Sequence, residues 1–427
     1  MLSFAETDLV HRDHAIPGLA MVLDPDTFAT ALRRAAPDAD LRTAQITYRR
    51  YKPQNFCRVA YRLDVAGAEL DLDVRACRPE DLASWLGDRD GLQVTGPLGH
   101  GRIVLEDRAI VVNVFPNDLK LPQLHHLADP GKRERVLRKL LPDHPGLWQG
   151  ELRCLRYRPE RRYVAELRAE GETRALLKSY TPRAFTRSKH NAKAFHSGPT
   201  LRIARLLGCS DRRRLLAFEW LPGRLLFDLL AAPKLDLQAV TATGAALAAL
   251  HAQVPEGLVS WTPEATIADL LSLSLELGFI CPELACRADK LARGFTEQLA
   301  AGPARQCTIH GDFTAKQVLV NQQEVAIIDL DWAGRGDPAG DLGNAIAQAE
   351  RCALSGELSA TRVELFRDAL LEGYARTNRP LPERITLYTA LELFRRTRFP
   401  FRAHEPDWPQ RTEALLARAE AIWDMIA

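Results

Sequence analysis

Hydrophobic and polar residues follow two different periods along this chain of 427 residues. Before Pro222, short apolar runs alternate with polar residues and end at turns that contain glycine, such as Gly67 and Gly171. This is the pattern of antiparallel strands. After Pro222, apolar residues recur at helical spacing, which predicts amphipathic helices. The predicted helices cover residues 235–252, 268–279, 284–300, 362–374 and 413–426.

One strand-like patch interrupts the helical half. Residues 307–321 and 324–331 alternate short apolar runs with polar residues, so we expect short strands inside an otherwise helical region. Together with the β-rich first half, this pattern predicts an α+β chain. The patch also contains the polar residues whose spacing points to chemistry.

A short motif occurs twice, with a spacing of 106 residues. The sequence R-Y-K-P at residues 50–53 matches R-Y-R-P at residues 156–159. After each copy come a strand, a glycine turn, a second strand, a helix and another pair of strands, the last pair within residues 102–115 and 201–221. Both copies therefore predict the order β-β-β-α-β-β. We expect a duplication. The alternative is two unrelated antiparallel sheets that share a turn motif by chance.

Composition excludes several classes of protein. Hydrophobic residues make up 46% and charged residues 26% of the chain, which is typical of a folded globular protein, and the length predicts more than one domain. The 57 Lys and Arg residues nearly balance the 55 Asp and Glu residues, so we expect no nucleic-acid partner. No stretch is apolar enough to cross a bilayer, so we expect no membrane partner.

The cysteines and the N-terminus bear on the compartment. The eight Cys residues form no C-x-x-C pair, and a chain of this size does not need disulfides. Glu6 and Asp8 come before any apolar stretch that could serve as a signal-peptide core. We therefore expect reduced thiols in a cytoplasmic protein.

Three polar residues of the strand-like patch have the spacing of a phosphoryl-transfer site. Asp312 and Gln317 lie in one loop, and Asp329 ends the next strand. Phosphoryl transfer needs a carboxylate near the attacking hydroxyl and oxygen ligands for Mg²⁺. Asp312 could supply the first, and Gln317 with Asp329 could supply the second. Each residue alone would more often be an ordinary loop or cap residue, so the joint spacing carries the prediction.

These residues belong to longer motifs that resemble a known group of enzymes. The run H-G-D-F-T-A-K-Q-V-L-V at residues 310–320 is followed by I-I-D-L-D at 327–331 and G-D-P-A-G-D-L at 336–342. This succession resembles the aminoglycoside phosphotransferase and choline kinase superfamily. The resemblance implies a bilobal protein-kinase-like fold, with a β-rich N-lobe and a mainly α-helical C-lobe. It also implies ATP and Mg²⁺ as cofactors and a small hydroxylated molecule as substrate.

The resemblance assigns roles by position in the motifs. Asp312 corresponds to the catalytic Asp of the superfamily and Asp329 to its metal-binding Asp. His310 corresponds to the residue that braces the catalytic loop, and Asp341 to a buried Asp that steadies it. Gln317 stands where most members have Asn, but it keeps the amide oxygen that could bind the metal. Maltokinase-like and other sugar-kinase branches resemble this chain in having Gln there, so we interpret Gln317 as the marker of such a branch.

The nucleotide side shows a weaker resemblance. Lys178 ends an apolar strand, where kinases place the cation that binds the α- and β-phosphates. Glu219 lies in F-E-W-L-P-G at residues 218–223, which resembles the segment whose backbone meets adenine. Because the chain has no G-x-G-x-x-G motif, we expect Arg158 and Arg161 to cover the phosphates. The alternative is that both are solvated turn residues.

Two lysines complete the candidate site. Lys316 lies four residues after Asp312, and its ammonium could reach the γ-phosphate as charge develops. Lys178 lacks the acidic partner that kinases place on the following helix, since residues 179–210 contain no Asp or Glu. Lys178 would then have a substitute partner, such as Asn191 or a carboxylate from elsewhere, or stand unpaired. The missing carboxylate also keeps open an alternative, a nucleotide-binding pseudokinase with a regulatory role.

These assignments divide the chain into three segments. Residues 1–120 would form an N-terminal α+β cap or degenerate N-lobe-like repeat, 121–222 the kinase N-lobe, and 223–427 the helical C-lobe with the catalytic loop. In the first repeat the counterpart of Lys178 falls near Arg75, where neighbouring carboxylates would repel phosphates. We therefore expect this copy to hold no ATP. The H-R-D at residues 11–13 spells a protein-kinase motif by chance.

The sequence thus predicts an ATP-dependent phosphotransferase that phosphorylates a hydroxyl of a small molecule, such as a sugar, amino sugar or aminoglycoside-like polyol. A protein kinase is disfavoured because Asp341 follows Asp329 too closely for an activation segment. His251 ends a predicted helix and is interpreted as a packing residue. The arginines near the C-terminus could form a basic lip that favours an anionic or neutral sugar, or a solvated surface. These arginines are Arg395, Arg396, Arg398 and Arg402. The sequence specifies no oligomeric state.

Overall fold

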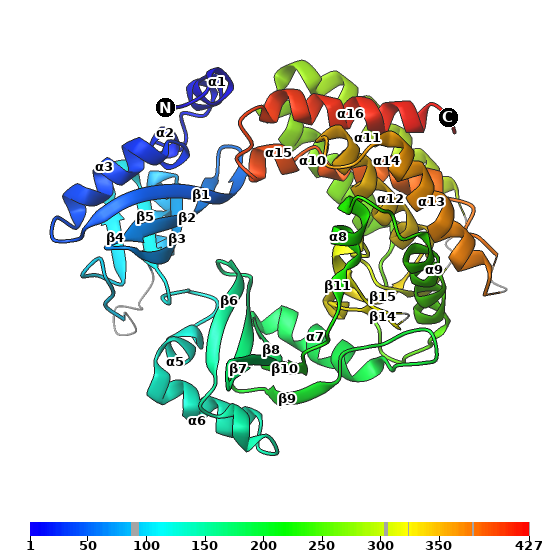
Figure 1. Cartoon of the computed structure of the whole chain (residues 1–427). Helices are drawn as coiled ribbons and strands as arrows, with labels where there is room; N and C mark the ends of the chain where they lie inside the picture. Colours follow the sequence, from blue (N-terminus) through cyan, green and yellow to red (C-terminus); the bar gives the residue numbers. More distant parts are fainter. Residues whose placement is uncertain (87–93, 303–305, 323, 378–379, 427) are drawn as a thin grey trace. The chain divides into compact units, whose positions relative to one another are not determined.

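Two five-stranded sheets form the β-rich half of the chain (Figure 1). The computed structural model describes all residues except 87–93, 303–305, 323, 378–379 and 427. The first sheet consists of β1 (Leu41–Lys52), β2 (Phe56–Val65), β3 (Ala68–Cys77), β4 (Arg102–Leu105) and β5 (Ile110–Val114). The second consists of β6 (Glu151–Arg158), β7 (Arg162–Ala169), β8 (Glu172–Tyr180), β9 (Leu206–Ser210) and β10 (Leu215–Glu219). The strand orders, β1-β2-β3-β5-β4 and β6-β7-β8-β10-β9, are the same, as a duplication requires.

The chain divides into two compact units. The first comprises Met1–Thr181, Ser210–Leu215 and Phe399–Pro409, and the second comprises Pro182–Cys209, Leu216–Arg398 and Gln410–Ala427. The first sheet, together with β6 to β8, belongs to the first unit. The three segments predicted from the sequence have other boundaries, and they stay a prediction.

Short helices before each sheet begin in the same way. α2 (Leu19–Leu23) and α3 (Pro25–Ala35) precede the first sheet, while α5 (Leu124–Ala128) and α6 (Pro130–Leu140) precede the second. Asp24 caps α3 by accepting the backbone N–H of Asp26, and Asp129 caps α6 by accepting that of Lys132. In both helices a proline occupies the first turn, where its missing N–H costs no hydrogen bond.

The first hairpin of each sheet is fixed by an aspartate from the preceding segment. Asp13 accepts hydrogen bonds from the Tyr51 hydroxyl (2.5 Å) and the backbone N–H of Gln54 (2.8 Å). Asp118 accepts the equivalent bonds from Tyr157 (2.8 Å) and the backbone N–H of Glu160 (2.6 Å). Gln54 and Glu160 also share a left-handed backbone, with φ of 56° and 53°. The local geometry is therefore repeated, and Asp13 of the chance H-R-D motif has a structural role in the first copy.

Strand register identifies the counterpart of Lys178. In the second sheet Lys178 pairs with Val164, and in the first sheet Arg75 pairs with Arg58, which lies 106 residues before Val164. Arg75 thus takes the place of Lys178 in the first copy, as expected from the sequence. Its guanidinium stacks on Trp85, 3.6 Å from the ring centroid.

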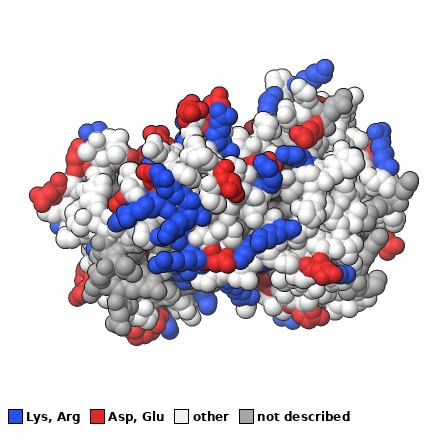
Figure 2. Space-filling model, turned by 90° about the horizontal axis from the view of Figure 1, so that it is seen from below, with Lys and Arg blue, Asp and Glu red and all other residues white. Residues whose placement is uncertain are grey.

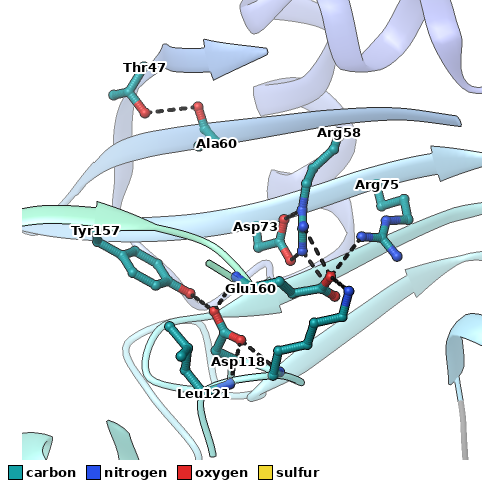
Figure 3. Close-up of polar contacts among 10 residues, drawn as sticks. Thr47, Arg58, Ala60, Asp73, Arg75, Asp118, Leu121, Tyr157 and Glu160 are labelled. Carbon is teal, nitrogen blue, oxygen red and sulfur yellow. Dashed lines mark hydrogen bonds and ion pairs between the residues drawn. The ribbon is translucent and has the colours of Figure 1, made fainter. Parts of the chain in front are cut away.

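A buried ion-pair network joins the first sheet to the turn between β6 and β7 (Figure 3). Glu160 of this turn lies 3.0 Å from Arg58, 3.2 Å from Arg75 and 3.0 Å from Lys120. Arg58 also donates to Asp73 at 2.5 Å and 2.6 Å. Burial would raise the pKa of Glu160, but the surrounding cations outweigh it and lower the pKa to about 2. The guanidinium of Arg75, which stands at the position of Lys178 in the first copy, is therefore paired with a carboxylate of the second copy.

The second unit is mainly helical. Its helices are α7 (Pro182–Ala194), α8 (Leu226–Ala231), α9 (Leu237–Ala252), α10 (Pro263–Ile280), α11 (Ala285–Ala301), α12 (Ala339–Leu354), α13 (Ala360–Ala375), α14 (Ile385–Arg396) and α16 (Trp408–Trp423). α9 and α13 cross closely, because a Cβ on Gly373 would lie 1.9 Å from the carbonyl oxygen of Thr241. All five predicted helices are present, while α12 and α14 were not predicted. Within the described residues, no helix has the length and apolar character needed to cross a membrane.

Short strands in the second unit position the candidate site. β12 (Cys307–Ile309) pairs with β15 (Gly334–Gly336), and β13 (Val318–Asn321) pairs with β14 (Glu324–Ile327) and β11 (Arg224–Leu225). The strand-like patch of the sequence is confirmed, and with it the α+β class. The loops after β12 and β14 carry the predicted catalytic and metal-binding residues.

Candidate active site

One buried carboxylate holds the loop after β12. Asp341, in the first turn of α12, accepts the backbone N–H of His310 at Oδ2 (2.6 Å) and that of Gly311 at Oδ1 (2.9 Å). Hydrogen bonds from amides to a charged acceptor are among the stronger ones in proteins. Asp341 therefore fixes the start of the loop that carries Asp312.

His251 completes the support of Asp341. Nε2 of His251 lies 2.9 Å from Oδ2 of Asp341, and Nδ1 lies 2.9 Å from the hydroxyl of Tyr374. All three side chains are buried. Burial would raise the pKa of Asp341, but the hydrogen bonds and charges of His251 and His310 outweigh it, so the pKa is lowered. Asp341 is thus held in its charged form, which is the form that accepts the loop amides.

His310 links the loop to the segment after β14. Its Nδ1 accepts the backbone N–H of Asp312 at 3.3 Å, and its Nε2 lies 2.9 Å from the carbonyl oxygen of Ile328. A neutral imidazole that accepts at one nitrogen donates at the other, so Nε2 carries the proton. The ring is completely buried. It braces Asp312 against the residue that precedes Asp329.

Gly311 allows the two segments to approach closely. Its φ is +78°, and a Cβ at this position would lie 2.4 Å from the carbonyl oxygen of Trp332. A side chain here would meet a steric clash in addition to the cost of left-handed backbone. The glycine of the H-G-D motif is therefore required by local geometry.

Asp312 borders a cavity of about 330 Å³ that lies within the second unit. Although the residue is exposed at the cavity, desolvation by the surrounding protein raises the pKa of its carboxyl. The electrostatic interaction with His310 acts in the opposite direction and the charge of Asp329 adds to the rise, so the net pKa is raised. A raised pKa makes the carboxylate a stronger proton acceptor, provided that it remains ionised at the working pH.

The cavity contains more acidic than basic residues. Its charged lining residues are Asp269, Asp312, Asp337, Asp341, Glu392, Arg384, Arg395 and Arg398. Arg395 donates to Asp269 at 3.1 Å and to Glu392 at 2.7 Å, and Arg398 lies 3.7 Å from Asp269. Two arginines that the sequence offered as a basic lip are thus paired with carboxylates. They form neither an unpaired basic lip nor a solvated surface.

Aromatic side chains supply the apolar part of the lining. Trp261, Trp332 and Tyr388 all border the cavity, and the two tryptophan rings lie with their centroids 5.6 Å apart. The indole N–H of Trp261 donates to the carbonyl oxygen of Trp332 at 3.1 Å. An aromatic face beside carboxylates suits a ligand with both C–H faces and polar groups.

Asp329 and Gln317 carry the oxygen atoms that a metal ion could use. Asp329 follows β14 in the left-handed conformation, with φ of 66°, and Gln317 follows the turn that begins at Thr314. The carbonyl oxygen of Gln317 accepts the backbone N–H of Ile328 at 2.9 Å, which ties the two segments together. The Thr314 hydroxyl donates to the side-chain oxygen of Gln317.

The oxygen donors of Asp329 and Gln317 are of the type that Mg²⁺ uses. No group of three or more His, Cys, Asp or Glu side chains that could hold a metal occurs in the part of the chain that the structure describes. Mg²⁺ commonly needs only one or two protein oxygens, because water and phosphate oxygens supply the rest. Asp329 and Gln317 carry oxygen donors of this kind, and their binding of Mg²⁺ together with a nucleotide stays a prediction.

α7 is anchored on the segment after Asp329. The side-chain amide of Asn191 donates to the carbonyl oxygens of Leu330 (2.8 Å) and Ala333 (3.0 Å). Arg187 donates to the carbonyl oxygen of Asp331 at 2.8 Å and stacks on Trp332, 3.9 Å from the ring centroid. The sequence suggested Asn191 as one possible substitute partner for Lys178, and the partner of Lys178 stays a prediction. The amide of Asn191 holds α7 to the loop that carries Asp329.

Two other predicted residues have contacts of their own. The ammonium group of Lys316 lies 4.3 Å from the ring centroid of Phe227, and its approach to a γ-phosphate stays a prediction. The carboxylate of Glu219 accepts hydrogen bonds from Arg202 (2.8 Å) and from the backbone N–H of Arg205 (2.9 Å). Glu219 thereby fixes the end of β10, where the sequence placed the adenine contact.

The remaining predicted residues belong to the first unit. Lys178 is buried on β8. Arg158 ends β6 and is partly buried, whereas Arg161 is exposed in the following turn. Their convergence with Asp312 and Asp329 of the second unit stays a prediction.

Sequence reasoning missed several residues of the site. His251 was interpreted as a packing residue, and Asp269 and Glu392 were not considered. His251 and Asp269 meet their partners across large separations, 90 residues for His251 and Asp341 and 126 for Asp269 and Arg395. A periodicity pattern contains no signal for such pairs.

Comparison with known proteins identifies a family and a set of similar structures. A model of the phosphotransferase enzyme family matches residues 126–388. Among solved structures, a thermostable mutant of the aminoglycoside phosphotransferase APH(4)-Ia is 17% identical, with a TM-score of 0.48, covering 64% of this chain and 93% of that one. A choline/ethanolamine kinase family protein from Mesorhizobium loti is 19% identical, with a TM-score of 0.46 and coverages of 69% and 95%. Choline kinase from Cryptosporidium parvum Iowa II is 13% identical, with a TM-score of 0.48 and coverages of 70% and 96%. A search of curated proteins found no significant match.

Proposed function

The chain belongs to the phosphotransferase enzyme family, and from this premise we propose that it transfers the γ-phosphate of ATP to a hydroxyl of a small polyol. The resemblance that the sequence motifs indicated is confirmed, as is the protein-kinase-like α+β fold that it implied. The maltokinase-like branch suggested by Gln317 stays a prediction.

The position of Asp312 carries this proposal. Its carboxylate borders a cavity large enough for a small molecule, and it is fixed at its backbone by His310. In the proposed reaction Asp312 accepts the proton of the substrate hydroxyl as that oxygen attacks phosphorus. Its raised pKa increases its strength as a base. Asp341 and His251 act on the loop and do not touch the reacting atoms.

Other residues would bind the nucleotide and its metal ion. Asp329 and Gln317 would hold Mg²⁺, which offsets the charge on the phosphates when bound. Lys178 would bind the α- and β-phosphates, with Arg158 and Arg161 above them, and Glu219 would mark the adenine contact. Lys316 would act on the γ-phosphate.

The cavity supports a neutral or cationic substrate over an anionic one. Five acidic and three basic side chains line it, and Arg395 and Arg398 are already paired with Asp269. An anion would therefore meet a net negative lining, whereas hydroxyl and amino groups could donate to the carboxylates. Trp261 and Tyr388 offer faces for the C–H side of a sugar ring. We propose a sugar, an amino sugar or an aminoglycoside-like polyol as substrate.

A substrate screen tests the proposal. Purified protein with Mg²⁺ and ATP is incubated with neutral mono- and disaccharides, amino sugars, sugar acids and aminoglycosides, and ADP release is measured with mass spectrometry of the product. We expect a phosphorylated product from the neutral or amino compounds and none from the sugar acids. Asp269→Asn should raise the KM for an amino substrate about tenfold, the typical value of one charged hydrogen bond, and leave the KM for ATP unchanged. Preference for sugar acids would contradict the substrate class.

A further inference from the structure

A buried asparagine borders the cavity that contains Asp312. Asn344 lies in α12, three residues after Asp341, and its side chain is part of the cavity lining. Residues three apart on a helix lie on the same face, and this face of α12 holds the loop of Asp312 through Asp341. Only 8% of Asn344 is exposed. Its amide is therefore a buried polar group in the lining that Asp312 shares.

Arg396 determines which end of this amide faces the cavity. Nη2 of Arg396 donates to Oδ1 of Asn344 at 2.7 Å and to its backbone carbonyl oxygen at 3.2 Å. A guanidinium group carries only donors, so the amide oxygen must face Arg396 and the NH2 group is left for the cavity. Among the residues that the structure describes, Nδ2 of Asn344 has no hydrogen-bond partner. Buried donors usually have one, so this donor is available to a molecule in the cavity.

Glu392 holds Arg396 on its other side. Nη1 of Arg396 donates to the backbone carbonyl oxygen of Glu392 at 2.8 Å and lies 3.2 Å from its Oε2. Arg396 is only 7% exposed. Desolvation lowers the pKa of Arg396, and the charges of Glu392 and Asp312 oppose this change. The planar guanidinium is thus fixed at both of its terminal nitrogens, and the amide of Asn344 is oriented before any ligand binds.

The arginines of the cavity are already paired with carboxylates. Lys and Arg side chains gather in groups on the face shown in Figure 2, whereas the cavity is lined by five acidic and only three basic side chains. Arg395 and Arg398 lie 3.1 Å and 3.7 Å from Asp269. Arg384 lies 4.0 Å from Asp337. The amide of Asn344 therefore adds a donor that is not committed to a carboxylate.

We propose that Asn344 is a specificity-determining residue that donates through Nδ2 to a hydroxyl oxygen of the substrate, and that Arg396 is its positioning residue. This inference rests on the proposed function. A hydroxyl oxygen accepts a hydrogen bond, whereas an ammonium group cannot. Amino groups of the substrate could still meet carboxylates such as Asp269. At Asn344 an ammonium group would face a donor and leave both groups unpaired, which costs affinity.

The test measures binding by calorimetry, without nucleotide, so that no transfer occurs. The full-length protein is titrated with glucose, maltose, glucosamine and kanamycin, and the compound that binds the wild type most tightly is kept. Asn344→Leu should bind this compound about tenfold more weakly, as loss of one buried hydrogen bond predicts. Gln348→Leu is the matched control, because Gln348 carries an amide one turn further along α12 and lies outside the cavity lining. It should bind like the wild type.

Amino-deoxy analogues of the same compound test the chemistry of the contact. Each analogue has one hydroxyl replaced by an amino group. One analogue should bind the wild type about tenfold more weakly than the parent compound, while Asn344→Leu should bind the two with equal affinity. The same discrimination by both proteins would overturn the proposed contact.

A double variant tests the positioning role of Arg396. Arg396→Met should weaken binding as much as Asn344→Leu, and the double variant should be no weaker than Asn344→Leu alone, because both changes remove one interaction. Arg396→Lys, which keeps the charge but lacks the planar pair of donors, serves if Arg396→Met does not fold, and the same result is expected. Additive losses would show that Arg396 acts through the fold and not through Asn344.

These measurements separate the inference from the proposed function. If Asn344→Leu binds every compound as the wild type does, the role of Asn344 is overturned and phosphotransfer is unaffected. If Asn344→Leu binds more weakly but the wild type transfers no phosphate, the role of Asn344 is supported and the proposed function is contradicted. Absence of binding of any of these compounds by the wild type overturns the inference.

Discussion

Nε2 of His251 lies 2.9 Å from Oδ2 of Asp341, in the interior beside the loop that carries Asp312. The same carboxylate oxygen accepts the backbone N–H of His310 at 2.6 Å. One buried charge is therefore shared between a helix, α9, and the loop that positions Asp312. Loss of the histidine should affect both stability and catalysis.

We predict that His251→Phe lowers the free energy of unfolding by about 3 kcal/mol, because one partner of a buried charge is removed. The variant should also lower kcat, since the loop loses its support, and the change in the KM for ATP should be smaller. Tyr374→Phe is the control, because it removes only the hydroxyl that contacts Nδ1 and should cost about 1 kcal/mol. Urea unfolding and steady-state kinetics measure both effects. Equal stability of the two variants would mean that Asp341 does not need His251.

Gly311 offers a second test of the loop. Gly311→Ala places a Cβ 2.4 Å from the carbonyl oxygen of Trp332, whereas Gly356 has the same φ of +78° and open space around it. Gly356→Ala should cost about 1 kcal/mol, the usual cost of left-handed backbone for alanine. Gly311→Ala should cost more and should also lower kcat. If thermal unfolding shows the same loss for both variants, the close approach of the two segments is not rigid.

Glu160→Gln tests the network between the two copies. The variant leaves Arg58 and Arg75 without their shared carboxylate, and we expect a loss of about 3 to 5 kcal/mol near neutral pH. The pKa of Glu160 is lowered from 4.5 to about 2. Its contribution is therefore fully present above pH 4.5 and is lost as the pH falls toward about 2.

The measurement is urea unfolding of the wild type and Glu160→Gln across this pH range. Glu172→Gln is the control, because Glu172 is exposed and pairs with exposed Arg174. The difference between wild type and Glu160→Gln should shrink at acid pH, while Glu172→Gln should follow the wild type throughout. A difference that stays constant down to pH 2 would show that the glutamate acts through packing alone.

The raised pKa of Asp312 predicts the shape of the pH profile. As a base, Asp312 must be ionised, so kcat/KM should fall on the acid side at a higher pH than an ordinary aspartate, about 3.9, would give. The ionised carboxylate that favours catalysis lowers the stability of the folded state. The charged form is disfavoured in the folded state, so Asp312→Asn should unfold at higher temperature than the wild type at neutral pH. This advantage should vanish below the ordinary pKa, where both states are protonated. An acid limb at the ordinary aspartate value would contradict the desolvation of this carboxyl.

The sequence was most informative where chemistry is local. The spacing of His310, Asp312 and Gln317 placed them in one loop, and the repeated R-Y-[KR]-P motif anticipated two sheets with the same strand order. Both signals depend on residues close together in the chain. The repeated motif also aligned Arg75 with Lys178.

The features that escaped prediction depend on distant contacts. α12 begins at the motif that contains Asp341, and its pattern is obscured because nearly every side chain in its first three turns is buried. The pairing of Arg395 with Asp269 joins two helices 126 residues apart. Composition and periodicity report which residues face a core, but they do not report which buried polar groups will meet.

Transfer of phosphate by the wild type and by Asp312→Asn tests the central claim most directly. With Mg²⁺, ATP and a substrate from the screen, the wild type should produce phosphorylated product. Asp312→Asn should lose about a hundredfold or more in kcat, the usual contribution of a general base, while nucleotide affinity measured by calorimetry stays the same. Equal turnover by both proteins would contradict the role of Asp312. Nucleotide binding by the wild type with no transfer to any compound would identify a pseudokinase instead.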